Sequence, residues 1–391
     1  MIALLLSTVV ASSSVVEIPD ATAHEVTIQA IIRIPKLGAK DLAKLQIIVK
    51  AIPKQTEDYA RREMLVVTSG QPVQCQLTND VIRISASVQP DNVAAGLSLM
   101  ESLVRKASLF QENLDAAASE IERPDYWSAA LNPIEYPAVK LGPDEAQALY
   151  HRVIRPENLM LAVGGKIVPG DAQDKWERRM EAWSPGPKPK GYFDESVPTQ
   201  LLHNTSAVSV ITLAGSSIPS GDAALSTEAL AMFALGSGKG ASLFRVVREK
   251  HGWSYRQEAV LLPTLDGWQP QIVIAMKPTD DISQKVETIK SDLMEDVKNW
   301  NAADLARALG MASAVLDRNV PFSPLYVLGN SPAGTSLEDR TFLAGYWMMK
   351  TGKPWSPMGM LESMSHVTLE DLKDQATGIL NGATVRILPG N

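Results

Sequence analysis

An arginine and a tyrosine, Arg248 and Tyr255, lie close together in the sequence just after a glycine-rich segment. A guanidinium group and a phenolic hydroxyl held side by side can donate hydrogen bonds to one carbonyl oxygen, or to the oxyanion that it becomes under attack. Glycines let the backbone approach a ligand closely and expose its N–H groups. The glycines concerned are Gly236, Gly238 and Gly240. The pattern therefore indicates half of a site that binds a substrate carbonyl.

The local sequence predicts how the two side chains are placed. A helix is expected from near Gly240 to His251, with Gly252 just past its C-terminus, and Tyr255 is expected to open the next strand. Arg248 then lies in the last helical turn, and both side chains can project from one edge of the domain. The spacing is equally compatible with a structural role, in which Arg248 interacts with the helix dipole and Tyr255 lies half in the core.

A zinc-dependent hydrolase also needs residues that hold the metal. Two histidines four positions apart lie on one helix face and can bind zinc, and a glutamate between them can act as a base toward the bound water. The histidines of this chain are His24, His151, His203, His251 and His366. No two of them have that spacing, and Ile28 occupies the position where a second histidine would follow His24-Glu25. The one cysteine, Cys75, excludes an internal disulfide and a metal site built from cysteines. Neither a metal site nor a cofactor is expected in this chain.

The composition fits a soluble globular protein of two domains. The chain has 391 residues, of which 45% are hydrophobic and 21% are charged, and this length exceeds one comfortable core. The formal net charge of -7, with basic residues scattered among more numerous acidic ones, argues against nucleic acid as a partner. No stretch after the N-terminal segment is long and apolar enough to span a bilayer. Walker, GxGxxG and GxSxG motifs are absent as well.

The first residues leave two interpretations open. Residues 1–19 begin with an apolar run that ends near Ala11 and continues into small residues, which is typical of a secretory signal peptide, although a basic segment at its start is missing. This interpretation predicts a periplasmic or secreted protein. The alternative is an ordinary buried strand, or a mistaken start, in a cytoplasmic protein.

A segment rich in proline and glycine divides the chain. Residues 184–199 cannot continue a helix or a central strand and are expected to form an exposed linker between domains at 20–183 and 200–391. Both halves show a strand and a helix followed by a second strand and helix, which suggests duplication. The expected strands are 26–34 and 81–88 in the first half, and 207–214 and 272–277 in the second. The helices are expected to begin at Asp41 and after residue 91, and at Asp222 and after residue 281.

This order of elements predicts the fold class. Each half needs an open sheet with helices packed largely on one face. Strands 255–262 and 271–276 are joined only by the short turn 263–270, which favours antiparallel pairing and an α+β fold. A doubly wound parallel sheet is the alternative.

The segment around Arg248 resembles the C-terminal half of the M16 metallopeptidases, the insulinase, pitrilysin and mitochondrial processing peptidase family. The matching residues are Gly238-Lys239-Gly240, Leu243-Phe244, Arg248-Glu249-Lys250 and residues 252–255. A turn, strand and helix before the linker resemble the same family independently. The matching residues there are residues 155–165, Lys175-Trp176-Glu177 and Trp183. The resemblance runs from about Val26 to the end of the chain.

The resemblance implies two similar LuxS/MPP-like domains, each a mainly antiparallel sheet with helices on one face. It implies that Arg248 and Tyr255 hold the substrate backbone and stabilise the tetrahedral intermediate, on a domain that faces a zinc-bearing domain across a cavity. It also implies substrate handling by the loop of Gly236, Gly238 and Gly240, as in the family's non-catalytic mitochondrial subunit. The family's HxxEH motif on the first long helix is absent here, since residues 41–50 contain no histidine.

These features predict the non-catalytic, substrate-binding subunit of a heterodimeric M16-type zinc metallopeptidase. The partner would be an HxxEH-containing homologue that holds the zinc, the substrate would be a peptide, and the chain alone would have no activity. One alternative is an inert structural or peptide-binding protein that resembles the core subunits of bc1 complexes. Another is a self-sufficient peptidase with an unrecognised metal site.

Overall fold

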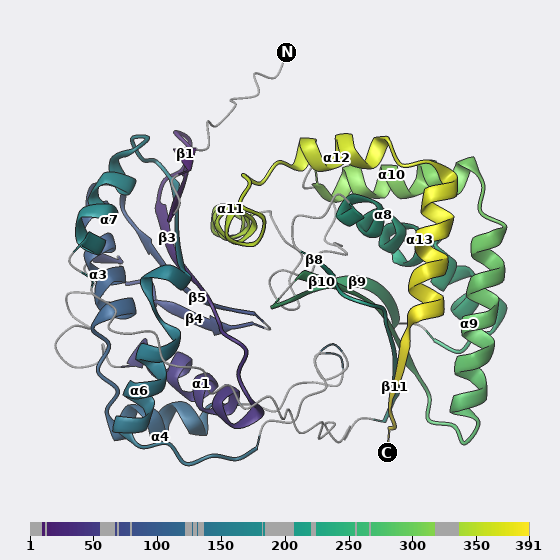
Figure 1. Cartoon of the computed structure of the whole chain (residues 1–391), viewed down its shortest axis with the longest axis horizontal. Helices are drawn as coiled ribbons and strands as arrows, with labels where there is room; N and C mark the ends of the chain where they lie inside the picture. Colours follow the sequence, from purple (N-terminus) through teal and green to yellow (C-terminus); the bar gives the residue numbers. More distant parts are fainter. Residues whose placement is uncertain are drawn as a thin grey trace. The chain divides into compact units, whose positions relative to one another are not determined.

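The chain forms two compact units, which are described separately (Figure 1). Unit 1 comprises Met1–Arg123, Tyr136–Pro198 and Thr335–Trp355, and unit 2 comprises Pro124–Glu135, Thr199–Gly334 and Ser356–Asn391. Each predicted half thus supplies most of one unit and one segment of the other. The structure, a computed structural model, describes all residues except 1–9, 12–13, 55–66, 69, 79, 122–126, 128–130, 132–136, 182, 184–206, 220–223, 255, 266, 317–335 and 391. The predicted linker and the predicted cap Asp222 lie outside the described residues.

Unit 1 contains a six-stranded sheet in the order β1-β2-β6-β3-β5-β4. Its strands are β1 (Val10–Ala11), β2 (Val15–Pro19), β3 (Val26–Arg33), β4 (Gln74–Leu77), β5 (Val81–Val88) and β6 (Leu159–Gly165). β2 and β6 pair in parallel, and the other neighbours pair antiparallel. β3 and β5 are the two strands predicted for the first half, and they lie side by side with Val26 opposite Val88.

Helices cover one face of this sheet (Figure 1). They are α1 (Ala39–Ala51), α3 (Val93–Arg105), α4 (Gln111–Ser119), α6 (Pro143–Val153) and α7 (Asp171–Glu181). Alternate residues of β3 point to opposite faces, and Ile28 points to this one. A Cβ atom placed on Gly96 of α3 would lie 2.6 Å from Cδ1 of Ile28. Glycine at this position therefore lets α3 pack closely on the sheet.

Helix α11 (Leu337–Thr351), from the second half of the sequence, covers the opposite face of the same sheet (Figure 1). A Cβ atom placed on Gly345 would lie 2.7 Å from Cδ1 of Ile31. Near the start of the helix, Nε2 of Gln29 donates to the carbonyl oxygen of Glu338 at 2.6 Å, and the Arg83 guanidinium lies 2.7 Å from the Glu338 carboxylate. Unit 1 therefore adds a helix on the second sheet face to the helices predicted on the first.

A buried ion pair holds the last turn of α11. Nζ of Lys350 lies 2.8 Å from Oδ2 of Asp80, and the two side chains are 1% and 2% exposed. The Tyr346 hydroxyl donates to the same carboxylate oxygen at 2.7 Å. Burial raises the pKa of Tyr346 well above its usual value, and the charge of Asp80 raises it further. The hydroxyl is therefore a permanent donor to Asp80.

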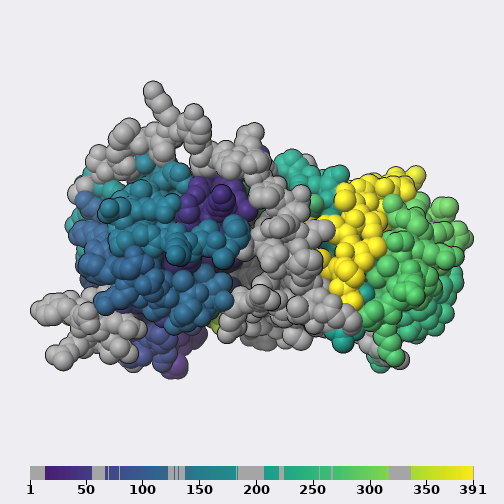
Figure 2. All heavy atoms as spheres, turned by 90° about the horizontal axis from the view of Figure 1, so that it is seen from below, coloured from purple at the N-terminus to yellow at the C-terminus, as the bar shows by residue number. Residues whose placement is uncertain are grey.

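Unit 2 contains an antiparallel sheet in the order β11-β7-β10-β8, with β9 also paired to β10. Its strands are β7 (Ser209–Ala214), β8 (Ile218–Pro219), β9 (Arg256–Thr264), β10 (Gly267–Met276) and β11 (Thr384–Leu388). Its helices are α8 (Ala224–Gly236), α9 (Ile282–Lys298), α10 (Ala302–Leu316), α12 (Pro357–Ser365) and α13 (Leu369–Gly382). Helices α13 and α9 pack against each other, and Figure 2 shows the C-terminal residues of the chain, in yellow, beside green residues of the same unit.

The β9–β10 hairpin is tighter than the predicted turn at 263–270. Thr264 is opposite Gly267 and Pro263 is opposite Trp268, so both strands run further toward the turn than expected. The sequence prediction placed Pro263 in the turn. Pro263, however, lies in β9, which pairs with β10 alone among the described strands, and an edge strand tolerates a residue that has no N–H group.

A segment of the first half packs on the sheet of unit 2. Trp127 and Leu131 are buried in one apolar cluster with residues of β7, β9, β10 and β11. The Arg256 guanidinium lies over the Trp127 ring, 4.0 Å from its centroid. Each half of the sequence thus contributes one segment to the core of the other unit.

Strand β2 includes the end of the segment predicted as a signal peptide. Glu17 of β2 is fully buried, and its carboxylate accepts hydrogen bonds from the backbone N–H groups of Gly170 and, at 2.8 Å, of Gln173, at the start of α7. A carboxylate satisfies the orphan donors at a helix N-terminus and complements its dipole. A leader that is cleaved without loss of this strand would therefore end before Val15.

We expect Lys350→Met to lower the free energy of unfolding by about 3–5 kcal/mol, because the Asp80 carboxylate would lose its buried counter-charge. Urea unfolding followed by circular dichroism measures the loss. Lys353→Met, at an exposed position after α11, is the matched control and should change little. The double variant Asp80→Asn/Lys350→Met should recover part of the loss. Simple addition of the two single effects would contradict the role given to the pair.

We expect a chain that starts at Ser14 to keep its fold, and a chain that starts at Asp20 to lose more than about 3 kcal/mol of stability. The shorter chain lacks the buried apolar side chains of β2 and the helix cap of Glu17. The soluble yield and the urea midpoint of the two proteins provide the measurement. Equal midpoints would show that β2 is dispensable.

Candidate functional site

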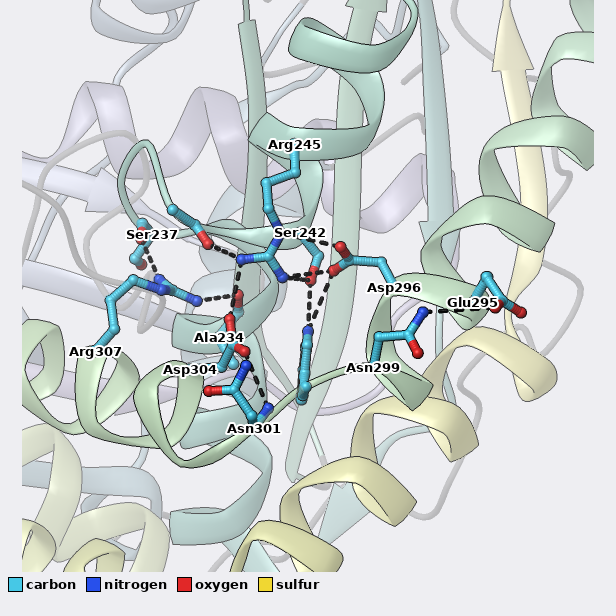
Figure 3. Close-up of polar contacts among 12 residues, drawn as sticks. Ala234, Ser237, Ser242, Arg245, Glu295, Asp296, Asn299, Asn301, Asp304 and Arg307 are labelled. Carbon is cyan, nitrogen blue, oxygen red and sulfur yellow. Dashed lines mark hydrogen bonds and ion pairs between the residues drawn. The ribbon is translucent and has the colours of Figure 1, made fainter.

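The glycine-rich segment forms the connection between α8 and a π-helix (η4, Phe244–Lys250) (Figure 3). Gly236 ends α8, and a Cβ atom there would lie 2.6 Å from the backbone nitrogen of Ala259 in β9. Gly238 has φ of +84°, in the left-handed region that favours glycine. A Cβ atom on Gly240 would lie 2.8 Å from Cδ of Arg307. Each of the three predicted loop glycines therefore has a local reason to be glycine.

Arg245 joins this loop to α9 and α10 through an ionic network. Its guanidinium makes two hydrogen bonds to the Asp296 carboxylate, at 2.9 and 2.7 Å, and one to Asp304 at 3.0 Å. It also donates to the carbonyl oxygen of Gly240. Hydrogen bonding to Asp296 raises the pKa of Arg245, although its partial burial opposes this shift. Arg245 is therefore a fixed charge at the end of the loop.

The Asp296 carboxylate lies at the centre of this network (Figure 3). Burial would raise its pKa, but hydrogen bonds from Arg245 and Ser242 outweigh that effect, and the pKa lies below its usual value. Nε1 of Trp300 donates to the same carboxylate at 3.2 Å and to the Ser242 hydroxyl at 2.9 Å. Asp296 is thus ionised at neutral pH and fully engaged in holding the loop.

Arg248 lies where the sequence predicted, in the last turn of the helix that follows the loop. It is exposed, and its guanidinium lies over the Phe244 ring, 5.1 Å from the centroid. Gly252 has φ of +66° and its N–H group donates to the Arg248 carbonyl at 3.0 Å, which ends the helix as expected. The helix is of the π type rather than the α type, and π turns are frequent at functional sites.

The other member of the predicted pair, Tyr255, lies outside the described residues. The next described residue, Arg256, begins β9, as the prediction of a strand at this point requires. The pairing of Arg248 with Tyr255 therefore stays a prediction.

His251 and its neighbours form a separate polar cluster beside Arg248. The His251 ring stacks on Trp253 with centroids 4.0 Å apart, and its Nε2 atom lies 2.7 Å from Oδ2 of Asp292. Nζ of Lys250 lies 2.7 Å from the same oxygen, and hydrogen bonding to Lys250 lowers the pKa of Asp292. This cluster fixes the end of the π-helix against α9.

The first helix does not fit a zinc ion. α1 reads AKDLAKLQIIVKA and contains no histidine, and its one carboxylate, Asp41, forms ion pairs with Arg152 and Lys44. Within the described part of the chain, no group of three His, Cys, Asp or Glu side chains could hold a metal ion. His24 is exposed just before β3, and His151 lies in the last turn of α6, where burial lowers its pKa.

Among the described helices, none combines the length and apolarity needed to cross a membrane.

Sequence reasoning missed the residues that hold the loop: Arg245, Asp296, Asp304 and Arg307. The two carboxylates lie 51 and 59 residues after Arg245 in the sequence. No local motif links these positions, and each charge taken alone resembles ordinary helix surface. Only the packing of α9 and α10 around the loop shows the network.

Comparison with known proteins supports the fold. Residues 140–309 match a family model described as Peptidase M16 inactive domain. The structure of a peptidase M16 inactive domain from Pseudomonas fluorescens is 14% identical, covers 97% of this chain and 96% of its own, and has a TM-score of 0.74. A protease from Helicobacter pylori is 11% identical, with coverage of 95% and 96% and a TM-score of 0.69. No curated protein sequence matches.

The first half of the periplasmic protease PqqL from Escherichia coli is similar as well, at 11% identity, with coverage of 96% of this chain and 89% of its own and a TM-score of 0.64. At these identities the likeness concerns the fold alone. The chain has an M16-like α+β fold with mainly antiparallel sheets, which confirms the predicted fold class.

The helix that leads into the loop carries a buried acid, Glu228, whose side chain accepts a hydrogen bond from Gln375 of α13. Burial raises its pKa from 4.5 to about 7. The folded protein therefore holds this proton more tightly than the unfolded chain does. The contribution of Glu228 to the free energy of unfolding is therefore fully present below pH 4.5 and is lost as the pH rises through about 7.

We expect the free energy of unfolding of the unmodified protein to fall by on the order of 3 kcal/mol between pH 5 and pH 8. The Glu228→Gln variant should not show this fall. Urea unfolding at several pH values measures the slope. Glu287→Gln, at an exposed position of α9, is the matched control and should keep the slope of the unmodified protein. Parallel pH curves for the unmodified protein and Glu228→Gln would contradict the assignment.

Proposed function

We propose that this chain is the non-catalytic, substrate-binding subunit of a heterodimeric M16-type zinc metallopeptidase. The observation that carries the proposal is the exposed Arg248, which ends a π-helix beside a glycine loop of defined geometry in a chain with an M16-like fold. The description of the family model, Peptidase M16 inactive domain, agrees with a sequence that lacks HxxEH. In this proposal the partner is an HxxEH-containing homologue, which holds the zinc.

Arg248 and Tyr255 would act on the substrate carbonyl. The guanidinium and the phenolic hydroxyl donate hydrogen bonds, and such donors stabilise negative charge that develops on the oxygen. The loop of Gly236, Gly238 and Gly240 would lie against the peptide backbone, since residues without side chains allow close approach. No step of metal chemistry is assigned to this chain.

A periplasmic or secreted location belongs to the same proposal, and a cytoplasmic location is the alternative. Its support is the apolar start of the sequence and the likeness to a protease described as periplasmic. Fractionation of cells that express the full chain, with mass spectrometry of its mature N-terminus, would test it.

We expect Arg248→Ala and Tyr255→Phe each to lower kcat/KM of the complex with the HxxEH-containing partner by about 10²–10³-fold, because each removes one donor to the oxyanion. Peptide turnover by the co-expressed, co-purified complex is the measurement. Glu249→Gln, at the exposed neighbouring position, is the matched control and should leave turnover unchanged.

Two results would decide against the proposal. Full turnover in the Arg248→Ala/Tyr255→Phe double variant would make the chain an inert structural or peptide-binding protein, for which the stacking of Arg248 on Phe244 gives Arg248 a packing role. Zinc binding and peptide cleavage by the purified chain alone would point to a self-sufficient peptidase.

A further inference from the structure

The glycine loop is held from α10 as well as from the π-helix. Arg307 of α10 donates to the carbonyl oxygen of Ser237 at 2.9 Å and to that of Ala234 at 2.8 Å (Figure 3). The carbonyls at a helix C-terminus have no intrahelical partner, and α8 ends at Gly236. A guanidinium group has donors in a fixed fork, so one side chain can satisfy both carbonyls.

Arg245 holds the other end of the same loop through the carbonyl oxygen of Gly240. The stem of Arg307 also packs on Gly240, where a Cβ atom would lie only 2.8 Å from its Cδ. The two guanidinium groups are close enough for the charge of Arg245 to lower the pKa of Arg307, after burial as the main cause. Asp296 and Asp304 neutralise Arg245, which lets both arginines occupy the same region.

The contacts leave the tip of the loop exposed. Gly238 and Lys239 are exposed and Gly240 is half-buried, while Ser237 before them and Ala241 after them are buried. The N–H group of Ala241 donates to the carbonyl of Gly238 at 3.1 Å, which turns the tip back into the π-helix. A loop with several glycines has high conformational entropy when it is free, and these contacts select one backbone conformation.

We propose that Arg307 and Arg245 are positioning residues that fix the glycine-rich loop as a preformed binding edge for a peptide substrate. This inference rests on the proposed function of the loop in substrate handling. The two arginines act through the carbonyls of residues 234, 237 and 240, and the exposed tip at Gly238 and Lys239 meets the peptide. Preorganisation lowers the entropy lost on binding, so its loss raises KM rather than lowering kcat.

The test begins with the chain alone. Arg307→Met removes the guanidinium hydrogen bonds but keeps an unbranched stem against Gly240. Hydrogen exchange measured by mass spectrometry should become about 10-fold faster in peptides that cover residues 236–241 and stay unchanged in the sheet of unit 2. Arg307→Lys should restore part of the protection. Arg178→Met, at an exposed position of α7, is the matched control. Unchanged exchange at residues 236–241 would overturn the proposal.

Gly238→Ala offers a second route to the same state, in case Arg307→Met does not fold. It strains a position with φ of +84° and leaves both arginines in place. The same local increase in exchange is expected. If exchange at residues 236–241 becomes faster in this variant while KM of the complex stays constant, the loop is not a preformed binding edge and the proposal is overturned.

The second measurement is peptide turnover in the complex with the HxxEH-containing partner. Arg307→Met should raise KM by about 5- to 10-fold with kcat nearly unchanged. A merely structural role would instead lower the amount of active complex at constant KM, and this result would overturn the proposal. If exchange becomes faster while KM stays constant and Arg248→Ala still impairs turnover, positioning is refuted and the proposed function survives. If Arg248→Ala/Tyr255→Phe leaves turnover unchanged, the proposed function fails, and exchange still reports on the loop.

Discussion

The buried ion pair between Asp80 and Lys350 ties α11 to the part of unit 1 that comes from the first half of the sequence. Neither charge is tolerated in so dry a position without the other. The pair lies at the C-terminal end of α11, and the contacts of Glu338 with Arg83 and Gln29 lie at the other end. Helix α11 is separated from β5 by more than half of the sequence, yet both of its ends are fixed to the sheet that contains β5.

This arrangement couples the two halves of the sequence. The chain passes from one unit to the other after Arg123, Glu135, Pro198, Gly334 and Trp355. Neither half contains a complete unit, because unit 1 needs α11 and the core of unit 2 includes Trp127 and Leu131. Contacts between residues so distant in sequence have a high entropic cost during folding, and such topologies fold slowly. The two halves of the sequence thus exchange segments between the two units.

Sequence patterns predicted the elements better than the contacts between them. β5 has the predicted bounds, and β3, α8 and α9 differ by one or a few residues, because alternation and helical periodicity are local signals. The place of α11 could not be predicted. Its contacts to the sheet include Glu338, Tyr346 and Lys350, and charged helical residues are normally expected on the surface. Their partners are Asp80, just before β5, and the polar side chains of Gln29 and Arg83 on the facing strands.

The same limit applies to the candidate site. Gly252 correctly predicted the end of the helix, and with it the position of Arg248, since a left-handed residue just past a helix is a local feature. The loop glycines were also identified. The reasons why these positions require glycine could not be predicted, because they lie in distant contacts. A side chain at Gly236 would collide with β9, and one at Gly240 would collide with the stem of Arg307. A glycine pattern alone suggests mobility, whereas the hydrogen bonds to both ends of this loop favour a single conformation.

Two arginines of one π-helix, Arg245 and Arg248, show why burial and charge must be considered together. Arg245 is partly buried between two carboxylates, and a cation so neutralised contributes little additional stabilisation to a further anion. Arg248, three positions later, is exposed, and its guanidinium lies over the Phe244 ring. The two residues therefore suit different tasks. Arg245 bonds to the loop backbone at Gly240, and the substrate contact proposed above is given to Arg248, the exposed one of the two.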